Sequence, residues 1–473
     1  MRGPFPLQPS VLIRLSPSVL SMSTKSSWLC ALLVGGAVLF SLTACSDSSD
    51  VGLGVGSDPL QGGQPATIDV TPALDTTQVA PITGDNALDR PSSQDAWRFL
   101  VGTVDDPVPG TGVVETNGYV DFSGRSSIPS EIASADSDSI DVELRLTTNY
   151  FHGYTTESMD VELYDLTAEA TMDSARATAS FAADEMTPAS VDMAQITPTD
   201  SLVTIELRQS WIDTNLGTLL NTGNDGGDFE EAFHGFKVVA PGSEAVVGFS
   251  SSTATLRLRT VSAGDTVTAD YVGLKTFTHV EQQSAGSPPS GYQLMQDGVG
   301  TGLTMAWDFE TNPLDTLGSD PLNRAEIFVP NDTSALEGFT PTDFERPQPQ
   351  GYRIIATRST APDAPSCSAV RSVVFSVANE ACVLPLLPSA APSAALVADN
   401  VSFPIFERSL RRVRTDQSPV FTTYRVHVAD RENTSVDQAA TVQPGLPTTL
   451  PALVPIDGTD PGPPRATLTV TPL

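Results

Sequence analysis

Hydrophobic and polar residues alternate over many short stretches of this chain. From Ile140 to Leu146, every second residue is apolar, and the residues between them are Asp, Glu or Arg. A period of two with polar partners is typical of half-buried strands in antiparallel sheets. The same alternation recurs at 159–163, 203–207, 256–258, 424–428 and 468–470. Clusters of Gly, Pro, Asn and Asp separate these stretches, so the pattern predicts short strands joined by turns.

Helical signal is scarce. Residues 210–221 place four apolar side chains on one face, which predicts a short helix with Ser210 as its N-cap, and residues 403–413 predict another. The chain also holds 35 Gly and 38 Pro among 473 residues, too many for long helices or a coiled coil. The predicted fold class is therefore all-β, with two antiparallel, jelly-roll-like β-sandwich units and few short helices.

The N-terminal region has the pattern of a secretory signal. Lys25 precedes an apolar run from Trp28 to Leu42, which is shorter than the roughly 20 apolar residues that span a bilayer. The run ends in Leu42-Thr43-Ala44-Cys45, and this sequence resembles the bacterial lipobox. The resemblance implies that Cys45 is diacylated and becomes the mature N-terminus; the alternative is an ordinary signal with a chance Cys. Met22 gives a better signal length than Met1, so we expect it to be the true start.

A weak internal repeat predicts two units. In each half, Val120–Phe122 or Trp307–Phe309 precedes a polar linker and an alternating strand, and a similar closing strand follows at 254–258 or 466–470. Chance similarity between strands is the alternative. The predicted division is a lipoprotein signal peptide (1–45), a flexible tether (46–66), a first β-sandwich (67–285) and a second β-sandwich (286–473).

The charge balance excludes one class of partner. The chain has 25 Lys+Arg against 57 Asp+Glu, so its net charge is −32. Without residues 1–45, 22 bases face 57 acids, which gives −35. Nucleic-acid binding needs a basic footprint and is not expected. Anionic lipid heads repel such a chain, so the membrane contact is expected through the acyl anchor alone.

The choice of acids and bases is typical of a salt-adapted, halophilic protein. Asp outnumbers Glu 38 to 19, and Lys occurs only three times in the whole chain. Concentrated salt screens the repulsion between carboxylates and tolerates such a surface. Cation binding or a repulsive coat is the alternative explanation.

Two cysteines remain after Cys30 is lost with the signal and Cys45 is acylated. They are Cys367 and Cys382, which flank the strand pattern at 373–377. In an exported protein such a pair predicts one disulfide. A metal site there is not expected, because neither Cys has a CxxC or nearby His partner.

The chain resembles a family in three short motifs. They are residues 51–58 after the lipobox, residues 101–107, and residues 233–238 ahead of the strand at 255–258. These motifs are similar to those of an uncharacterised Bacteroidota-type outer-membrane lipoprotein family, catalogued as a domain of unknown function. The first unit also resembles jelly-roll modules that bind polysaccharides. The resemblance implies an outer-membrane, lipid-anchored protein, either surface-exposed or on the inner leaflet, and it implies no catalytic residue.

Known catalytic and cofactor motifs are missing from the sequence. It contains no GxSxG, HExxH, Walker loop or strand-linked GxGxxG. The four His residues are scattered, and the acidic runs at 224–228 and 136–141 lack the spacing of a calcium loop. We therefore assign no catalytic residue, no metal ligand and no cofactor.

Arginines cluster near residue 410 in an otherwise acidic chain. On a helix, Arg408, Arg411 and Arg412 share a face by their i,i+3 and i,i+4 spacing. They either pair with the protein's own carboxylates or form a candidate anion-binding site for a glycan or lipid head group.

Two functions from different classes follow. The first is a non-catalytic structural or binding lipoprotein of the cell envelope, with a surface glycan or an envelope protein as partner. The second is an extracellular polysaccharide-degrading hydrolase that uses carboxylates, which a cleft with two close carboxyl groups would favour.

Overall fold

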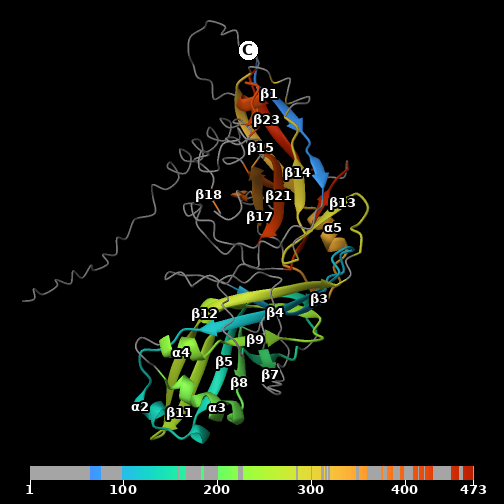
Figure 1. Ribbon diagram of the computed structural model, residues 1–473. Coiled ribbons are helices and arrows are strands. Elements are labelled where there is room, and N and C mark those ends of the chain that lie inside the picture. The colour runs from blue at the N-terminus through green and yellow to red at the C-terminus, as the bar shows by residue number, and fades with distance from the viewer. Residues whose placement is uncertain are drawn as a thin grey trace, which may run out of the picture. The chain divides into compact units, whose positions relative to one another are not determined.

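The computed structural model describes residues that all lie within the unit Gly62–Leu473. The described residues are 64–75, 98–156, 159–166, 183–185, 201–221, 227–283, 286–299, 301–309, 314, 317, 320–347, 351–358, 374–375, 381–386, 395–398, 409–413, 415–419, 421–429, 449–457 and 462–471. Antiparallel sheets dominate this part (Figure 1). The predicted all-β sandwich fold is confirmed.

The first half of the unit forms a sheet that closes on itself, here called the closed sheet. Its strands are β3 (Arg98–Asp105), β4 (Val113–Phe122), β5 (Asp141–Tyr154), β6 (Glu162–Leu166), β7 (Ala183–Glu185), β8 (Leu202–Glu206), β9 (Phe236–Val239), β10 (Ala245–Ser250), β11 (Thr255–Ser262) and β12 (Asp265–Gln283). The long β12 pairs with β11 through its first part and with β4 through its second part. The order β12-β11-β5-β10-β3-β4 therefore returns to β12.

The alternating sequence of β5 explains the packing of the closed sheet. Leu144 and Val142 point inward and are buried, and they lie opposite Leu256 and Leu258 of β11. These residues belong to one apolar cluster that fills the closed sheet. The hairpin from β11 to β12 turns at Ala263 and Gly264, which both have positive φ angles (53° and 92°). Two such residues match the right-handed twist of paired strands, which is why this tight turn is favoured.

Short helices cover part of the closed sheet. They are α2 (Ser130–Ala133), α3 (Gln209–Leu219) and α4 (Gly227–Ala232), with short 3₁₀ turns at Ser137–Ser139 and Ser251–Thr253. Helix α3 confirms the helix predicted at 210–221. Ser210 as its N-cap was wrong: Arg208 occupies that position, and no side chain caps the helix. The N-cap position lies two residues before Ser210, and the first helical residue, Gln209, donates a side-chain hydrogen bond to Asp213.

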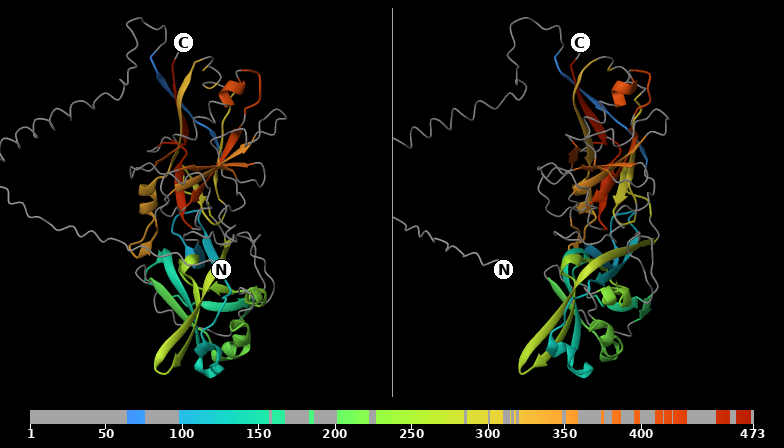
Figure 2. Two further views of the ribbon diagram at one scale, coloured as in Figure 1. Left: turned by 90° about the vertical axis from the view of Figure 1, so that its left-hand side faces the viewer. Right: turned by 60° about the vertical axis from the view of Figure 1, so that its left-hand side comes forward.

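Two further sheets pack face to face and are here called the sandwich. They contain strands from the second half of the unit together with the first two strands, β1 and β2. One sheet has the order β1 (Ala66–Val70), β23 (Arg465–Val470), β15 (Leu322–Pro330) and β20 (Ala395–Ala398). The other has the order β18 (Val374–Phe375), β19 (Ala381–Leu386), β17 (Gly351–Arg358), β21 (Phe421–Ala429), β14 (Leu303–Ala306) and β2 (Ala73–Asp75). Figure 2 shows blue β1 running beside red β23, its antiparallel partner.

Smaller elements lie beside the sandwich. The strands β13 (Tyr292–Gln296) and β22 (Pro451–Pro455) pair as a ribbon, and β16 (Phe344–Glu345) pairs with β5 of the closed sheet. Helix α5 (Thr333–Gly338) is capped by Asp332. Residues 409–413 are helical, which agrees with the described end of the helix predicted at 403–413.

The main apolar core continues from the sandwich into the closed sheet. It joins Ile327 and Leu468 of one sandwich sheet and Val426 of the other to Leu100 and Val246 of the closed sheet. Within the described part of the chain, no helix is both long enough and apolar enough to cross a membrane.

The strand pairings place the first two strands with the second half. Strands β1 and β2, which the predicted division assigns to the tether's end and the first unit, pair with β23 and β14. The predicted closing strands at 254–258 and 466–470 pair with the strands at 142–146 and 325–329, respectively. The boundary at 285/286 and the internal repeat stay predictions.

Candidate functional site

Of the site residues predicted from the sequence, Arg411 and Arg412 are the two whose side chains the structure describes. Cys45, Cys367 and Arg408 lie outside the described residues, and Cys382 lies on β19, where its side chain is not described. Arg411 is exposed on helix 409–413, and the half-buried Arg412 donates a 2.7 Å hydrogen bond from Nε to the carbonyl of residue Ser418.

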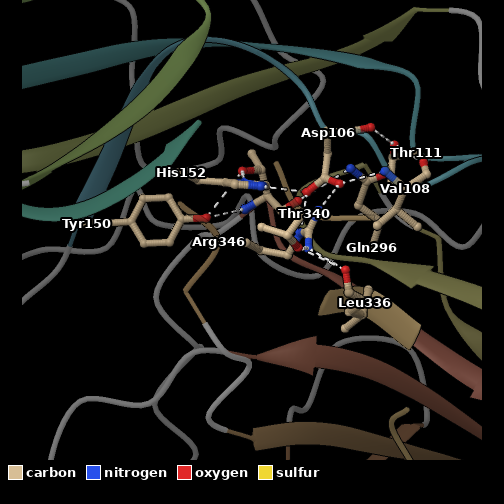
Figure 3. Close-up of polar contacts among 10 residues, drawn as sticks. Asp106, Val108, Thr111, Tyr150, His152, Gln296, Leu336, Thr340 and Arg346 are labelled. Carbon is tan, nitrogen blue, oxygen red and sulfur yellow. Dashed lines mark hydrogen bonds and ion pairs between the residues drawn. The ribbon is translucent and has the colours of Figure 1, made fainter. Parts of the chain in front are cut away.

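A buried cluster of polar side chains lies instead where the closed sheet meets the second half (Figure 3). Its core members are Asp106 after β3, His152 on β5, Arg346 after β16 and Thr449 before β22. Asp106 is 3% exposed, and His152 and Thr449 are 0% exposed. Such deep burial of polar groups is costly unless each one is hydrogen-bonded or paired.

Asp106 and Arg346 form a bidentate ion pair. Arg346 Nε and Nη2 donate to the two carboxylate oxygens of Asp106 at 2.7 and 2.6 Å. The backbone N–H of Val108 donates to the same carboxylate at 2.9 Å. Burial acts to raise the pKa of Asp106, but hydrogen bonds and charge from His152 and Arg346 outweigh it and lower the pKa from 3.8 to about 2. Asp106 is therefore ionised and only accepts hydrogen bonds.

The ionised carboxylate sets the direction of one hydrogen bond of His152. Its Nε2 lies 2.7 Å from Asp106 Oδ2 and must donate, because the carboxylate has no proton to give. On the other side of the ring, His152 Nδ1 lies 2.7 Å from the hydroxyl oxygen of Thr449 and forms a hydrogen bond with it. Both ring nitrogens therefore have a partner inside the cluster.

Tyr150 completes the set of partners around Thr449. Its hydroxyl forms a 3.3 Å hydrogen bond with Thr449 Oγ1 and accepts the backbone N–H of Thr449 at 3.2 Å. Burial raises the pKa of Tyr150 above its usual range, so the phenol stays protonated. The carbonyl of Thr449 accepts a long hydrogen bond from Gln296 Nε2 at 3.4 Å.

Local sequence explains how these groups approach one another. The turn after β3 is held by Thr111, whose hydroxyl donates to the carbonyls of Asp106 and Val108 at 2.8 and 2.6 Å. Gly153 follows His152 with a φ of 143°, and a Cβ there would lie 2.4 Å from the Cα of Ala245. Only glycine fits where the paired strands β5 and β10 approach each other this closely.

The order of carboxylate, imidazole and hydroxyl is also found in hydrolase triads. A nucleophile must reach its substrate, however, and the side chains of His152 and Thr449 have no exposed surface. The carboxylate is already neutralised by Arg346. We therefore interpret the cluster as a structural connection between distant segments.

No short sequence motif marks this cluster. Asp106 and Arg346 are 240 positions apart, and His152 and Thr449 are 297 positions apart, so no local spacing joins them. The one available signal was Asp106 itself, which lies in the motif at 101–107 and is followed by Pro107. His152, one of the scattered histidines, is buried with both ring nitrogens hydrogen-bonded.

Other candidate ligand sites find little support among the described residues. No group of three His, Cys, Asp or Glu side chains there is arranged to hold a metal ion. The run 224–228 lies largely outside those residues. Trp307 is buried, and Trp211 is half-buried against Phe233 and Phe236. Neither of these tryptophans forms an exposed strip for stacking on sugars.

The comparisons with known proteins give no family. No family model matches this chain, and no curated protein matches it significantly. The fold defines an all-β protein, and the resemblance to outer-membrane lipoproteins stays a prediction.

Proposed function

We propose that this chain is an exported protein of the cell envelope, anchored in the outer membrane by acyl chains on Cys45. Its role is non-catalytic: it supports or binds a surface glycan or another envelope protein. The observation that carries the proposal is Leu42-Thr43-Ala44-Cys45 at the end of the apolar run that follows Lys25. Two or more acyl chains make a stable membrane anchor.

The structure supports this proposal through its division of the chain. The compact unit begins at Gly62, 17 positions after Cys45, and its first strand is β1. The intervening residues are rich in Gly, Ser and Asp, a composition typical of a tether. An all-β unit that follows a segment of this composition is expected of a module held at a membrane surface.

The non-catalytic part of the proposal is supported by the buried cluster. Its hydroxyl and imidazole are closed to solvent, and its carboxylate is fully paired. Within the described residues, this cluster is closed to a substrate and connects distant segments of the chain.

The experiment has two arms. Cells that express the full chain are grown with an alkyne-labelled fatty acid, and the purified protein is tested for label and for the mass of its N-terminal peptide. The same protein in detergent is applied to a glycan array and used for pull-down from envelope extracts. We expect label on a peptide that begins at Cys45, together with a saturable partner. Turnover of a polysaccharide by the purified protein would instead support the hydrolase alternative.

A further inference from the structure

A strap from the second half crosses onto the closed sheet. The strap is residues 331–346, and it starts beside β22, where Asp332 N–H donates to the carbonyl of Leu453 at 2.8 Å. Its helix α5 packs Leu336 against Val108 and Leu453. At the other end, the carbonyl of Asp343 accepts the N–H of Thr155 at 2.9 Å.

The end of the strap becomes part of the closed sheet. Phe344 and Glu345 pair as β16 with Tyr154 and Gly153 of β5. The Phe344 ring stands edge-on to Tyr154 at 5.0 Å and to His152 at 5.5 Å. The next residue is Arg346, whose guanidinium enters the buried cluster with a side chain that is only 3% exposed.

Arg346 has partners on both sides of this junction. It neutralises Asp106 of the closed sheet, and its Nη1 donates to the carbonyl of Leu336 and to Thr340 Oγ1 within the strap. Thr449, next to β22, reaches the same cluster through His152. The strap and the segment before β22 are therefore both linked to the carboxylate of Asp106: the strap directly through Arg346, and Thr449 through His152.

The apolar core and the Arg346–Asp106 ion pair constrain the geometry of this junction to different degrees. The apolar core that joins the closed sheet to the sandwich is non-directional, so it tolerates small shifts. A bidentate guanidinium–carboxylate pair fixes both distance and angle. If Arg346 is removed, Asp106 stays behind as a buried charge without its main partner, and the closed sheet bears that cost.

We infer that Arg346, delivered by the strap, is the residue that couples the closed sheet to the sandwich, so that the two unfold as one cooperative unit. The tether enters the sandwich first, because β1 pairs with β23. If the proposed function holds, the sandwich is the part next to the anchor, and this coupling holds the closed sheet rigidly to the sandwich. The coupling itself does not depend on acylation at Cys45.

The test is equilibrium unfolding in guanidinium chloride of the full chain in detergent. Trp28 and Trp97 are replaced by Phe in every variant. A further Trp307→Phe leaves Trp211 to report on the closed sheet, and Trp211→Phe leaves Trp307 to report on the sandwich. Each reporter is measured with and without Arg346→Met. Arg259→Met is the matched control, because its ion pair with Asp141 is exposed and lies within the closed sheet.

We expect coincident transitions for both reporters in the parent chain and in Arg259→Met. In Arg346→Met the closed-sheet midpoint falls below the sandwich midpoint by at least about 0.5 M denaturant. Arg346→Lys keeps the charge and loses the bidentate geometry, so it separates the midpoints less and decides the question if the Met variant does not fold. Midpoints that fall together in both variants, or that already differ in the parent chain, overturn the inference.

Discussion

Arg346 lies 240 positions beyond Asp106 in the chain, yet its guanidinium holds both oxygens of that carboxylate at 2.6 and 2.7 Å. This pair joins the end of a strap from the second half to the first loop of the closed sheet. The hydrogen bonds of His152 and Thr449 continue from it, so four distant segments meet at one buried carboxylate.

Removing the hydroxyl of Thr449 tests whether the cluster stabilises the fold. Thr449→Val keeps the shape but leaves His152 Nδ1 and the Tyr150 hydroxyl without their shared partner. Unsatisfied buried polar groups cost about 1–3 kcal/mol each, so we expect the free energy of unfolding to fall by about that amount. Thr449→Ser retains the hydroxyl and is expected to lose less.

The matched control for Thr449→Val is Thr255→Val. The Thr255 hydroxyl donates to the carbonyl of Thr253 in an exposed bond of 3.1 Å. We expect its replacement to change stability by less than about 0.5 kcal/mol. Equal losses for the two variants in a denaturant titration would show that the cluster has no special energetic role.

The lowered pKa of Asp106 predicts that the free energy of unfolding decreases in acid. Because this pKa is lowered from 3.8 to about 2 in the folded protein, the ionised form stabilises the fold at pH values above about 4. That contribution disappears as the pH falls from about 4 towards 2. The shift corresponds to about 2 kcal/mol. In Asp106→Asn, thermal unfolding between pH 5 and pH 2 is expected to depend less steeply on pH, whereas an unchanged slope would contradict the assignment.

The sequence predicts the strands well and the site poorly, for a physical reason. Alternation is a local signal, so the buried face of β5 can be read from residues 140–146 alone. The pairing of β1 with β23 and the meeting of Asp106 with Arg346 depend on how distant segments pack, and no short spacing records them. Ser210 is not the helix cap, because the chain becomes helical after Arg208 and Ser210 is the second residue of the helix.

The excess of acids predicts that salt stabilises the protein. With 22 bases against 57 acids beyond residue 45, carboxylates repel one another more in the folded state than in the expanded chain. The Debye length falls from about 10 Å at 0.1 M to about 3 Å at 1 M salt. Ion pairs such as Arg257–Asp270, at 2.7 Å, offset only part of this repulsion.

We therefore expect the melting temperature of the chain from residue 46 onward to rise by several degrees between 0.1 and 2 M NaCl. Differential scanning calorimetry measures it directly. Choline chloride at equal ionic strength is a control that separates screening from specific binding of sodium. A flat or falling melting temperature would mean that pairing or bound cations already compensate the acids.

The cysteine pair predicts one disulfide in the exported protein. Cys367 and Cys382 are the two cysteines that remain after Cys45. A disulfide between them closes a loop and is expected to stabilise the fold by about 3 kcal/mol. Peptide mass spectrometry without reduction is expected to find the two cysteines linked. Alkylation of both thiols in protein purified from the envelope without reductant would rule the bond out.

Membrane fractionation of Cys45→Ala tests the central claim most directly. Cells that express the parent chain, Cys45→Ala and the control Cys30→Ala are separated into membrane and soluble fractions, and the intact mass of each product is measured. We predict that the parent chain and Cys30→Ala carry diacylglycerol on Cys45 and stay with the membrane. Cys45→Ala is expected to lack the lipid mass and to leave the membrane fraction. A Cys45→Ala product that stays membrane-bound with its signal cleaved would contradict the lipid-anchored account.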